Sequence, residues 1–238
     1  MNRSGIEYLD YSWSPITGCL HGPDTCPIVD DCWARAYANR FRSGYGPGFR
    51  PALHVSRLQE PLARKKPARI GVSFMGDMFG PQVYRHWQLQ VLEVMRCCPQ
   101  HTFIFLTKAG EQLPQFNPWP PNAWVGVSLT GALPGRDRLN LHSLWGVRAT
   151  VRWVSLEPFL GYEELPPPTE WGTVQWLVMG ATTGTRAAQP QLRWVQHMMD
   201  MAREQGIKVF LKKNLRRALP GLPILEEVPS WAPYYPSI

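Results

Sequence analysis

The sequence predicts an α/β protein built as a partial or full (β/α) barrel with parallel strands. Short runs that are apolar on both faces recur along the chain, and each is followed by turn residues and a more polar, helical stretch. This alternation is typical of buried parallel strands joined by right-handed helical crossovers. The composition, with 44% hydrophobic and 18% charged residues over 238 positions, is that of a globular domain with a sizeable core.

The expected strands follow one another at short intervals. They are Ile70–Phe74, Thr102–Thr107, Trp124–Ser128, Val151–Ser155, Trp176–Gly180 and Lys208–Lys212. A further strand before Cys19 brings the total to about six or seven, which suits a full or partial barrel. A doubly wound open sheet is the alternative, but no G-x-G-x-x-G motif follows any expected strand. In both arrangements, ligands gather at the carboxyl ends of the strands.

Helices are expected between these strands. Tyr84–Cys98 and Gln191–Gln205 each carry an apolar stripe at helical spacing, and Gly206 supplies a stop after the second. Trp33–Phe41 is a shorter helical stretch. We expect residues 1–218 to form the barrel domain, and residues 219–238, rich in proline and aromatic residues, to form a C-terminal extension packed on it.

The charge balance favours an anionic partner. The formal net charge is +7 and the pI is about 9.3, and basic proteins gain affinity for nucleic acids by releasing counterions from phosphates. A merely basic surface is the alternative, because no single run of lysine and arginine is dense. No secretion signal and no apolar run of about 18 residues occurs, so we expect a cytoplasmic protein without a membrane span.

Three cysteines lie close together near the N-terminus. Cys19, Cys26 and Cys32 fall on a loop rich in glycine and proline, and an odd total of five cysteines without an export signal argues for reduced thiols. Three thiolates can hold a [4Fe–4S] cluster and leave one iron open for a chelating ligand. A zinc site with His21 as the fourth ligand is a second possibility, and three unrelated thiols are a third.

The segments around these cysteines resemble a radical SAM (S-adenosylmethionine) family of phages and bacteria, which is often encoded beside a three-Cys-motif partner protein. Residues 6–19 resemble its W-N-P-x-T-G-C opening, and Phe49–His54 resembles its F-x-P-x-x-H segment. Further matching segments follow in the family's order: Val72–Phe79, Leu106–Lys108, Trp124–Ser128 and Val154–Gly161. The family is distantly similar to spore photoproduct lyase, which repairs a thymine lesion in DNA.

The resemblance implies a radical SAM type of barrel, with the cluster on Cys19, Cys26 and Cys32 and with SAM as the second cofactor. The segment from Ser73 to Asp77 would bind the SAM amino group, although Asp77 could instead cap the following turn. The residues expected to contact the cofactor are Trp33, Ser73, Gly76, Asp77, Ser128, Ser155 and Glu157. Lys108, Lys212 and Lys213, also at strand ends, are expected to bind an anionic group of the substrate.

Two departures from the family pattern matter. The family spaces its second and third cysteines two residues apart, whereas residues 27–31 intervene here and lengthen the loop, a change that loops tolerate. The second departure lies at Met179–Gly184, where the family tends to have G-G-E-S-G and this chain has no acidic residue.

Several residues are not expected to act in chemistry. Cys97 and Cys98 end a helix that leads into a strand, at the barrel face opposite the ligands, and are predicted to be buried structural thiols. No histidine pairs with a serine or cysteine as in a hydrolytic triad. The tryptophans are expected to serve packing: Trp87, Trp145, Trp153, Trp171, Trp176 and Trp194.

The function expected from these observations is that of a radical SAM enzyme. It would reductively cleave SAM at the cluster to give an adenosyl radical, and would act on an anionic substrate such as DNA or a nucleotide, in repair or modification of a lyase-like kind. An electron donor such as flavodoxin or ferredoxin is implied. A non-catalytic zinc-binding, nucleic-acid-binding protein is the alternative, and a family member that binds SAM without turnover is a third hypothesis.

Overall fold

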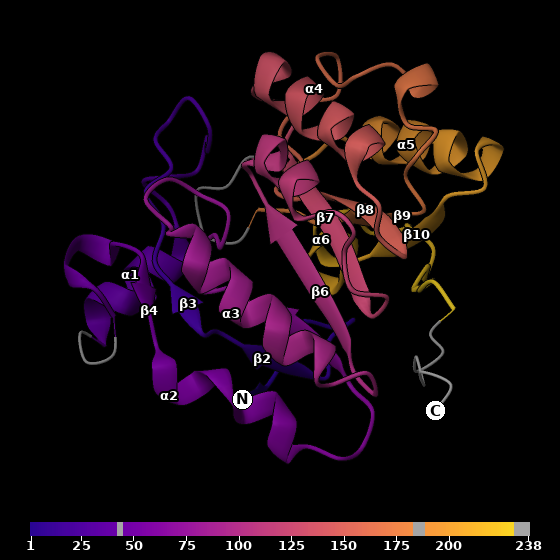
Figure 1. The fold of residues 1–238 in the computed structure, drawn as a ribbon. Coiled ribbons are helices and arrows are strands. Elements are labelled where there is room, and N and C mark those ends of the chain that lie inside the picture. The colour runs from indigo at the N-terminus through magenta and orange to yellow at the C-terminus, as the bar shows by residue number, and fades with distance from the viewer. Residues whose placement is uncertain (42–44, 183–188, 231–238) are drawn as a thin grey trace.

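A largely parallel sheet forms the centre of the molecule (Figure 1). The computed structural model describes residues 1–41, 45–182 and 189–230. The sheet has eight strands in the order β1-β2-β5-β6-β7-β8-β9-β10. Their bounds are Asn2–Arg3 (β1), Tyr11–Trp13 (β2), Arg69–Val72 (β5), Thr102–Thr107 (β6), Ala123–Leu129 (β7), Val151–Leu156 (β8), Trp176–Met179 (β9) and Lys208–Leu211 (β10). Ile16–Thr17 (β3) and Ala52–Leu53 (β4) form a separate antiparallel pair.

The prediction of an α/β fold with parallel strands is confirmed. Among the eight strands that the structure describes in the large sheet, β1 pairs antiparallel with β2, and each other neighbouring pair is parallel. Within the described part of the chain the strand order is linear and its two edge strands do not pair, so the sheet is a partial barrel. β6 has the predicted bounds. β5 ends two residues early because Ser73 has a φ of 58°, outside the extended region.

Helices connect the strands and cover one face of the sheet. The structure confirms helices at three predicted positions, namely α1 (Trp33–Arg40), α3 (Arg85–Arg96) and α5 (Leu192–Glu204). The α-helices not expected from the sequence are α2 (Val55–Leu58), α4 (Pro134–Ser143) and α6 (Lys213–Ala218). Short 3₁₀ helices lie at Pro47–Phe49 (η1), Glu60–Ala63 (η2), Gly110–Phe116 (η3), Leu144–Gly146 (η4) and Pro168–Glu170 (η5).

The two faces of the sheet bury different cores. Side chains of α3, α4 and α5 pack with alternate residues of the strands to form the larger core, on what we call the outer face. A smaller core lies on the opposite, inner face and is rich in aromatic residues. Its buried members are Tyr8, Leu9, Ile104, Trp124, Val151, Trp153, Trp176, Val178 and Phe210. Tyr8 joins this core from a loop, and the centroid of its ring lies 5.1 Å from that of Trp176 and 5.6 Å from that of Phe210.

A segment near the C-terminus pairs with the edge strand β10. The Leu211 N–H donates to the Leu225 carbonyl at 2.7 Å, and the Glu227 N–H donates to the Val209 carbonyl at 3.0 Å. The Trp176 indole N–H donates to the Glu227 carbonyl at 2.8 Å. Residues 219–230 thus include a stretch that contacts the sheet, while residues 231–238 of the predicted extension lie outside the described residues. The division into barrel and extension stays a prediction.

No helix in the described ranges combines the length and the apolar character needed to cross a membrane.

Candidate functional site at the carboxyl ends of the strands

The inner face of the sheet changes from apolar to polar toward the carboxyl ends of the strands. On β7, Trp124 and Gly126 are followed on the same face by Ser128, because side chains alternate along a strand. On β8, Trp153 is followed by Ser155 and then, just past the strand, by Glu157. The same alternation places the strand-end residues Lys108 and Lys212 on this face, and Ser73 directly follows the end of β5 at the same edge of the sheet. The carboxyl ends therefore form a polar rim above an aromatic floor.

Two lysines of this rim contact neighbouring strands. The Lys108 ammonium donates to Ser128 Oγ at 3.1 Å, and the Ser128 hydroxyl donates to the Glu157 carbonyl at 3.4 Å. The Lys212 ammonium lies 2.5 Å from Glu157 Oε1 and forms a largely buried ion pair with it. Gly180 leaves room for this pair, since a Cβ at that position would lie 2.8 Å from the Glu157 carboxyl group. These contacts join the ends of β6, β7, β8 and β10.

Two hydroxyls of the rim are buried without a hydrogen-bond partner among the described residues. Ser73 is 2% and Ser155 is 1% exposed, and both Oγ atoms are unpaired. Leaving a buried hydroxyl unpaired costs about 1–3 kcal/mol. Ser73 also adopts a positive φ of 58°, a strained conformation for a residue with a side chain. Unpaired buried groups and strained backbone are both typical of ligand sites.

Asp77 is the junction between the polar rim and the cysteine loop. Its carboxylate accepts hydrogen bonds from the Thr107 hydroxyl (2.7 and 2.9 Å), the Lys108 N–H (2.9 Å) and the Phe79 N–H (3.0 Å). The fourth donor is His21, whose Nε2 lies 2.8 Å from Asp77 Oδ2. Burial alone would raise the pKa of Asp77, but the hydrogen bonds and the His21 charge outweigh it, so the pKa lies below its ordinary value.

This arrangement bears on the predicted role of Asp77. A carboxylate offers about four lone-pair positions, and the four groups that donate to Asp77 occupy them. The hydrogen bond from the Phe79 N–H caps the turn that follows Asp77, which was the alternative role expected for this residue. Binding of the SAM amino group by Asp77 stays a prediction, and it requires that one of these donors be released.

The start of the cysteine loop is clamped between two backbone segments. The Gly18 N–H donates to the Met75 carbonyl (3.0 Å), and the Cys19 N–H donates to the Phe49 carbonyl (2.8 Å). Gly18 has a φ of 92°, and a Cβ on Gly76 would lie only 2.3–2.9 Å from the Gly18 backbone. Because Gly76 has no side chain, its backbone can lie directly against the backbone of Gly18. Both glycines are required to seat Cys19 beside the end of β5.

Residues 6–19 and the segment Phe49–His54, which both resemble family motifs, contact each other. β3 and β4 bring Thr17 next to His54, whose Nε2 lies 2.8 Å from Thr17 Oγ1. The His54 N–H donates to the Pro15 carbonyl at 2.7 Å. Burial, with a smaller contribution from Arg57, lowers the pKa of His54, which favours a neutral ring. The second segment thus supports the chain that leads into Cys19.

Cys19 and Cys32 pack around one small apolar cluster formed by Ala34, Ala38 and Phe49. Cys32 immediately precedes α1, and Cys26 lies in a turn closed by its N–H to the Gly22 carbonyl at 2.9 Å. Burial raises the pKa of the Cys19 thiol to about 12, and the Asp77 charge adds to the increase. A cationic centre at Cys19 would have to displace the thiol proton.

The expected convergence of the three sulfurs is not present. Among the described residues, which include all five cysteines, no three Cys, His, Asp or Glu side chains come close enough together to hold a metal ion. Assignment of the cluster to Cys19, Cys26 and Cys32 stays a prediction, and metal–thiolate bonds would have to supply the free energy that gathers such ligands. The three cysteines fit an iron–sulfur cluster in number, in donor type and in sharing one loop, but they do not form a ready-made cage.

His21 is not available as a zinc ligand in this geometry. The residue is 5% exposed, its Nε2 contacts Asp77, and its Nδ1 lies 3.0 Å from Thr25 Oγ1. Both ring nitrogens are therefore engaged, and zinc binding would have to break one of these contacts.

The remaining predicted residues lie apart from the rim contacts. Trp33 is 55% exposed at the start of α1, and Lys213 is exposed at the start of α6, where its N–H donates to Glu7 Oε1 at 2.8 Å. Cys98 is fully buried, as predicted. The prediction of a buried Cys97 is wrong, because Cys97 follows the last residue of α3 and is exposed. Of the segment Met179–Gly184, Thr183 and Gly184 lie outside the described residues.

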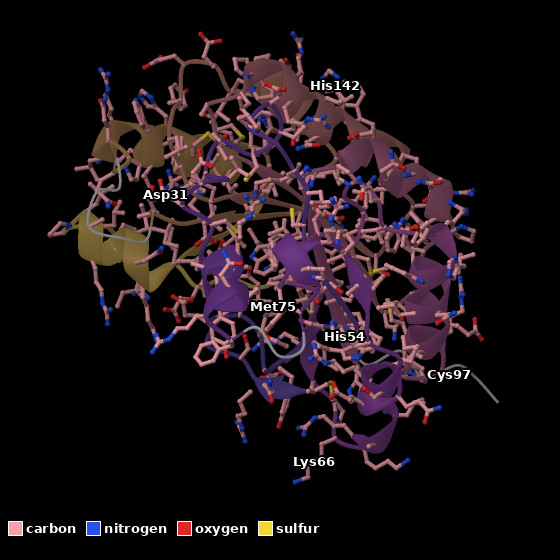
Figure 2. The ribbon with its side chains drawn as sticks, turned by 90° about the vertical axis from the view of Figure 1, so that its left-hand side faces the viewer. Asp31, His54, Lys66, Met75, Cys97 and His142 are labelled. Atoms are coloured by element: carbon pink, nitrogen blue, oxygen red, sulfur yellow. The ribbon has the colours of Figure 1, made fainter. Side chains whose placement is uncertain are left out.

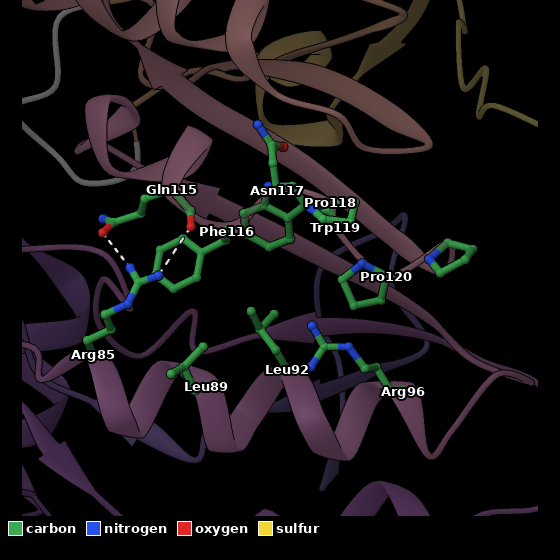
Figure 3. Close-up of a pocket in the computed structure, with 11 residues that line it drawn as sticks. Arg85, Leu89, Leu92, Arg96, Gln115, Phe116, Asn117, Pro118, Trp119 and Pro120 are labelled. Carbon is green, nitrogen blue, oxygen red and sulfur yellow. Dashed lines mark hydrogen bonds between the residues drawn. The ribbon is translucent and has the colours of Figure 1, made fainter.

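A pocket of about 400 Å³ lies elsewhere, between α3 and residues 115–121 (Figure 3). Arg85 and Arg96 flank it, and Leu92, Phe116 and Trp119 are among the apolar residues that line it. None of its lining residues belongs to the polar rim or the cysteine loop. This pocket is therefore separate from the candidate site.

Sequence reasoning did not find the His21–Asp77 contact. The two residues are 56 positions apart, and nothing in the spacing of either segment signals that they meet. The zinc alternative singled out His21 as a fourth ligand beside the three cysteines. In the structure, His21 contacts Asp77 instead.

Comparison with known proteins agrees with the fold. No curated protein matches the chain. Two solved structures of spore photoproduct lyase are similar to it, one a mutant with bound AdoMet and dinucleoside spore photoproduct, the other complexed with dinucleoside spore photoproduct. Their sequence identities are 12% and 11%, the TM-score is 0.55 for both, and the match covers 92% of this chain and 77% of each of the others. A family model described as "Protein of unknown function (DUF5131)" matches residues 3–216, and the chain belongs to that family.

Proposed function

We propose that this protein is a radical SAM enzyme, with a [4Fe–4S] cluster held by Cys19, Cys26 and Cys32. The observation that carries the proposal is the Asp77 junction. It ties the loop that bears the three thiols, through His21, to Lys108 on the polar rim. Thiol ligands and a rim of lysines, serines and a glutamate thus adjoin at the carboxyl ends of parallel strands, where barrels of this type place their ligands.

When bound, a cluster on three thiolates has one iron free to bind the amino and carboxylate groups of SAM and supplies the electron that cleaves SAM. The chain's own residues have the task of orienting SAM. Lys108 carries a positive charge suited to a carboxylate. Ser73 and Ser155 offer the two unpaired hydroxyls to polar groups of SAM, and Glu157, held by Lys212, can accept from ribose hydroxyls.

The proposed substrate is anionic, such as DNA or a nucleotide. The net charge of +7 supports this choice, as does the likeness in fold to a lyase that holds a dinucleoside lesion. We also propose an electron donor of the flavodoxin or ferredoxin kind, and a three-Cys-motif protein as a further partner.

The test is iron and sulfide analysis of anaerobically reconstituted protein, followed by reduction with dithionite in the presence of SAM. We expect about four irons per chain and formation of 5′-deoxyadenosine and methionine. Cys19→Ala, Cys26→Ala and Cys32→Ala should each abolish cleavage. Cys97→Ala, at an exposed thiol away from the loop, is the matched control.

Two results would contradict the proposal. One is retained SAM cleavage in all three single variants. The other is a colourless protein that binds one zinc per chain and is indifferent to SAM, which would favour the zinc-binding alternative.

A further inference from the structure

Helix α1 presents a row of exposed aromatic side chains. Trp33, Tyr37 and Phe41 recur every four residues from its start and are 55%, 47% and 44% exposed. Residues at this spacing lie on one face of a helix. The adjacent face of the helix is buried through Ala34 and Ala38. We call Trp33, Tyr37 and Phe41 the aromatic stripe.

Two rings of the aromatic stripe contact each other, and a neighbouring tyrosine ring adjoins them. The ring centroids of Tyr37 and Phe41 are 4.6 Å apart, and the Tyr45 ring lies 6.2 Å from that of Tyr37 at a near-perpendicular angle. Single exposed apolar residues are ordinary, whereas contiguous ones mark a surface that binds something.

The charge beside the stripe is positive. Arg40, the last residue of α1, places its guanidinium 5.3 Å from the centroid of the Phe41 ring, whereas Arg35 lies on the far side of the helix and its Nε is buried. Neither arginine forms an ion pair with any residue in the described ranges, and α1 contains no acidic residue. The nearest acids along the chain are Asp30 and Asp31, which precede the helix. The surface is thus aromatic with one unneutralised guanidinium group, that of Arg40.

The position of α1 links this surface to the candidate site. Its buried face packs on Phe49 together with Cys19, Cys32 and Met75. Figure 2 has α1 and Met75 side by side at the front of the molecule. A molecule lying along the stripe would therefore adjoin the cysteine loop.

We propose that the aromatic stripe binds unpaired bases of a single-stranded nucleic acid, with Arg40 neutralising a phosphate. Proteins that hold single strands combine aromatic rings, on which bases stack, with a basic surface that follows the backbone. A duplex would hide the base faces that these rings require. The inference rests on the proposed function and deepens it, because it names unpaired nucleic acid as the substrate class of the same site.

The test is fluorescence anisotropy of a fluorescein-labelled 20-mer of thymidine, titrated with the full-length chain prepared without oxygen. Tyr37→Ala should weaken binding about tenfold, the range measured for one stacked base. Tyr37→Phe keeps the ring and should bind like the parent chain. Trp145→Ala is the matched control, because Trp145 is 52% exposed and lies in η4, where it stacks on His142.

A second probe separates stacking from charge. An abasic strand of the same length retains the phosphates and lacks the bases, so Tyr37→Ala and the parent chain should bind it equally. Circular dichroism and the melting temperature confirm that each variant is folded. The proposal is overturned by equal affinity of Tyr37→Ala and the parent for the thymidine strand, by an equal loss on the abasic strand, or by a similar loss in Trp145→Ala.

This binding assay uses neither SAM nor reductant. A chain that binds the strand through the stripe and does not cleave SAM would refute the proposed enzyme and leave this surface in place. A chain that cleaves SAM and binds the strand equally well with Tyr37→Ala would support the proposed enzyme and refute the role of the aromatic stripe.

Discussion

The Nε2 atom of His21 lies 2.8 Å from Oδ2 of Asp77, inside a contact in which both side chains are almost fully buried. His21 belongs to the cysteine loop, and Asp77 follows the end of β5. The same carboxylate receives the Thr107 hydroxyl and the Lys108 N–H at the end of β6. One carboxylate therefore fixes the relative positions of the cysteine loop and two strand ends.

Replacement of Asp77 by Asn should destabilise the protein. The amide keeps one acceptor oxygen and turns an NH₂ group toward donors, so at least one buried donor loses its partner, at about 1–3 kcal/mol. We expect a loss of about 2–4 kcal/mol in the free energy of unfolding, measured in urea. Asp31→Asn, at an exposed position on the same loop, should change it by less than about 0.5 kcal/mol. Equal stabilities of the two variants would refute the assigned role of Asp77.

Gly76→Ala should disturb the seat of Cys19. The added Cβ would lie 2.3 Å from the Gly18 carbonyl oxygen and 2.6 Å from its nitrogen, and backbone cannot rotate away as a side chain can. We expect about 1–3 kcal/mol of destabilisation and a lower iron content after reconstitution. Gly22→Ala is the control on the same loop, because its Cβ would meet nothing within 4 Å. Iron retention that is equal in both variants would show that the Gly18–Gly76 contact does not matter for loading.

Ser155→Ala should separate stability from ligand binding. The Oγ of Ser155 is buried and has no partner among the residues described, so its removal should leave the free protein equally stable or slightly more stable. If the hydroxyl serves SAM, the same variant should show a smaller rise in melting temperature on adding SAM. Ser143→Ala, at the last residue of α4, is the control, because that hydroxyl already donates to the Leu139 carbonyl. A clear loss of stability in the free Ser155→Ala protein would show that the Ser155 hydroxyl already has a structural partner.

The two adjacent cysteines should differ in reactivity. Burial raises the pKa of the Cys98 thiol to about 11, with Cys97 adding to the increase, whereas the Cys97 side chain is exposed. Because the thiolate is the reactive form, about one thousandth of Cys98 is reactive at pH 8, and its fraction rises with pH. Alkylation with iodoacetamide, mapped by mass spectrometry, should modify Cys97 first. In urea both should react at similar rates, and fast reaction of Cys98 in the folded protein would contradict its burial.

The sequence predicted the strands well because each is a short apolar run bounded by turn residues. β6 and β8 begin at the predicted residues, since Thr102 and Val151 follow clear breaks. Helix α4 was not predicted, because Pro134 and Gly135 open it and its apolar stripe is weak. Proline is tolerated in the first turn of a helix, where no intrahelical N–H bond is lost.

Part of the candidate site was also predictable. Lys108, Ser128, Ser155, Glu157 and Lys212 lie in or directly after the ends of four strands, β6, β7, β8 and β10, and parallel strands bring such residues to one rim. The contacts that join this rim to the cysteine loop could not be foreseen, because the His21–Asp77 pair depends on how a long loop folds back. The arrangement of the three sulfurs depends on how the same long loop folds, so residue spacing alone does not determine it.

The aromatic floor of the inner face determines the direction from which a reactant can arrive. Tyr8, Trp153 and Trp176 close the amino-terminal side with rings that are 0–2% exposed. A molecule that contacts Lys108 or Glu157 would therefore have to come from the side of the carboxyl ends of the strands. For the proposed function, access from one side alone would let a long polymer present a single protruding unit there while its remainder stays outside the protein.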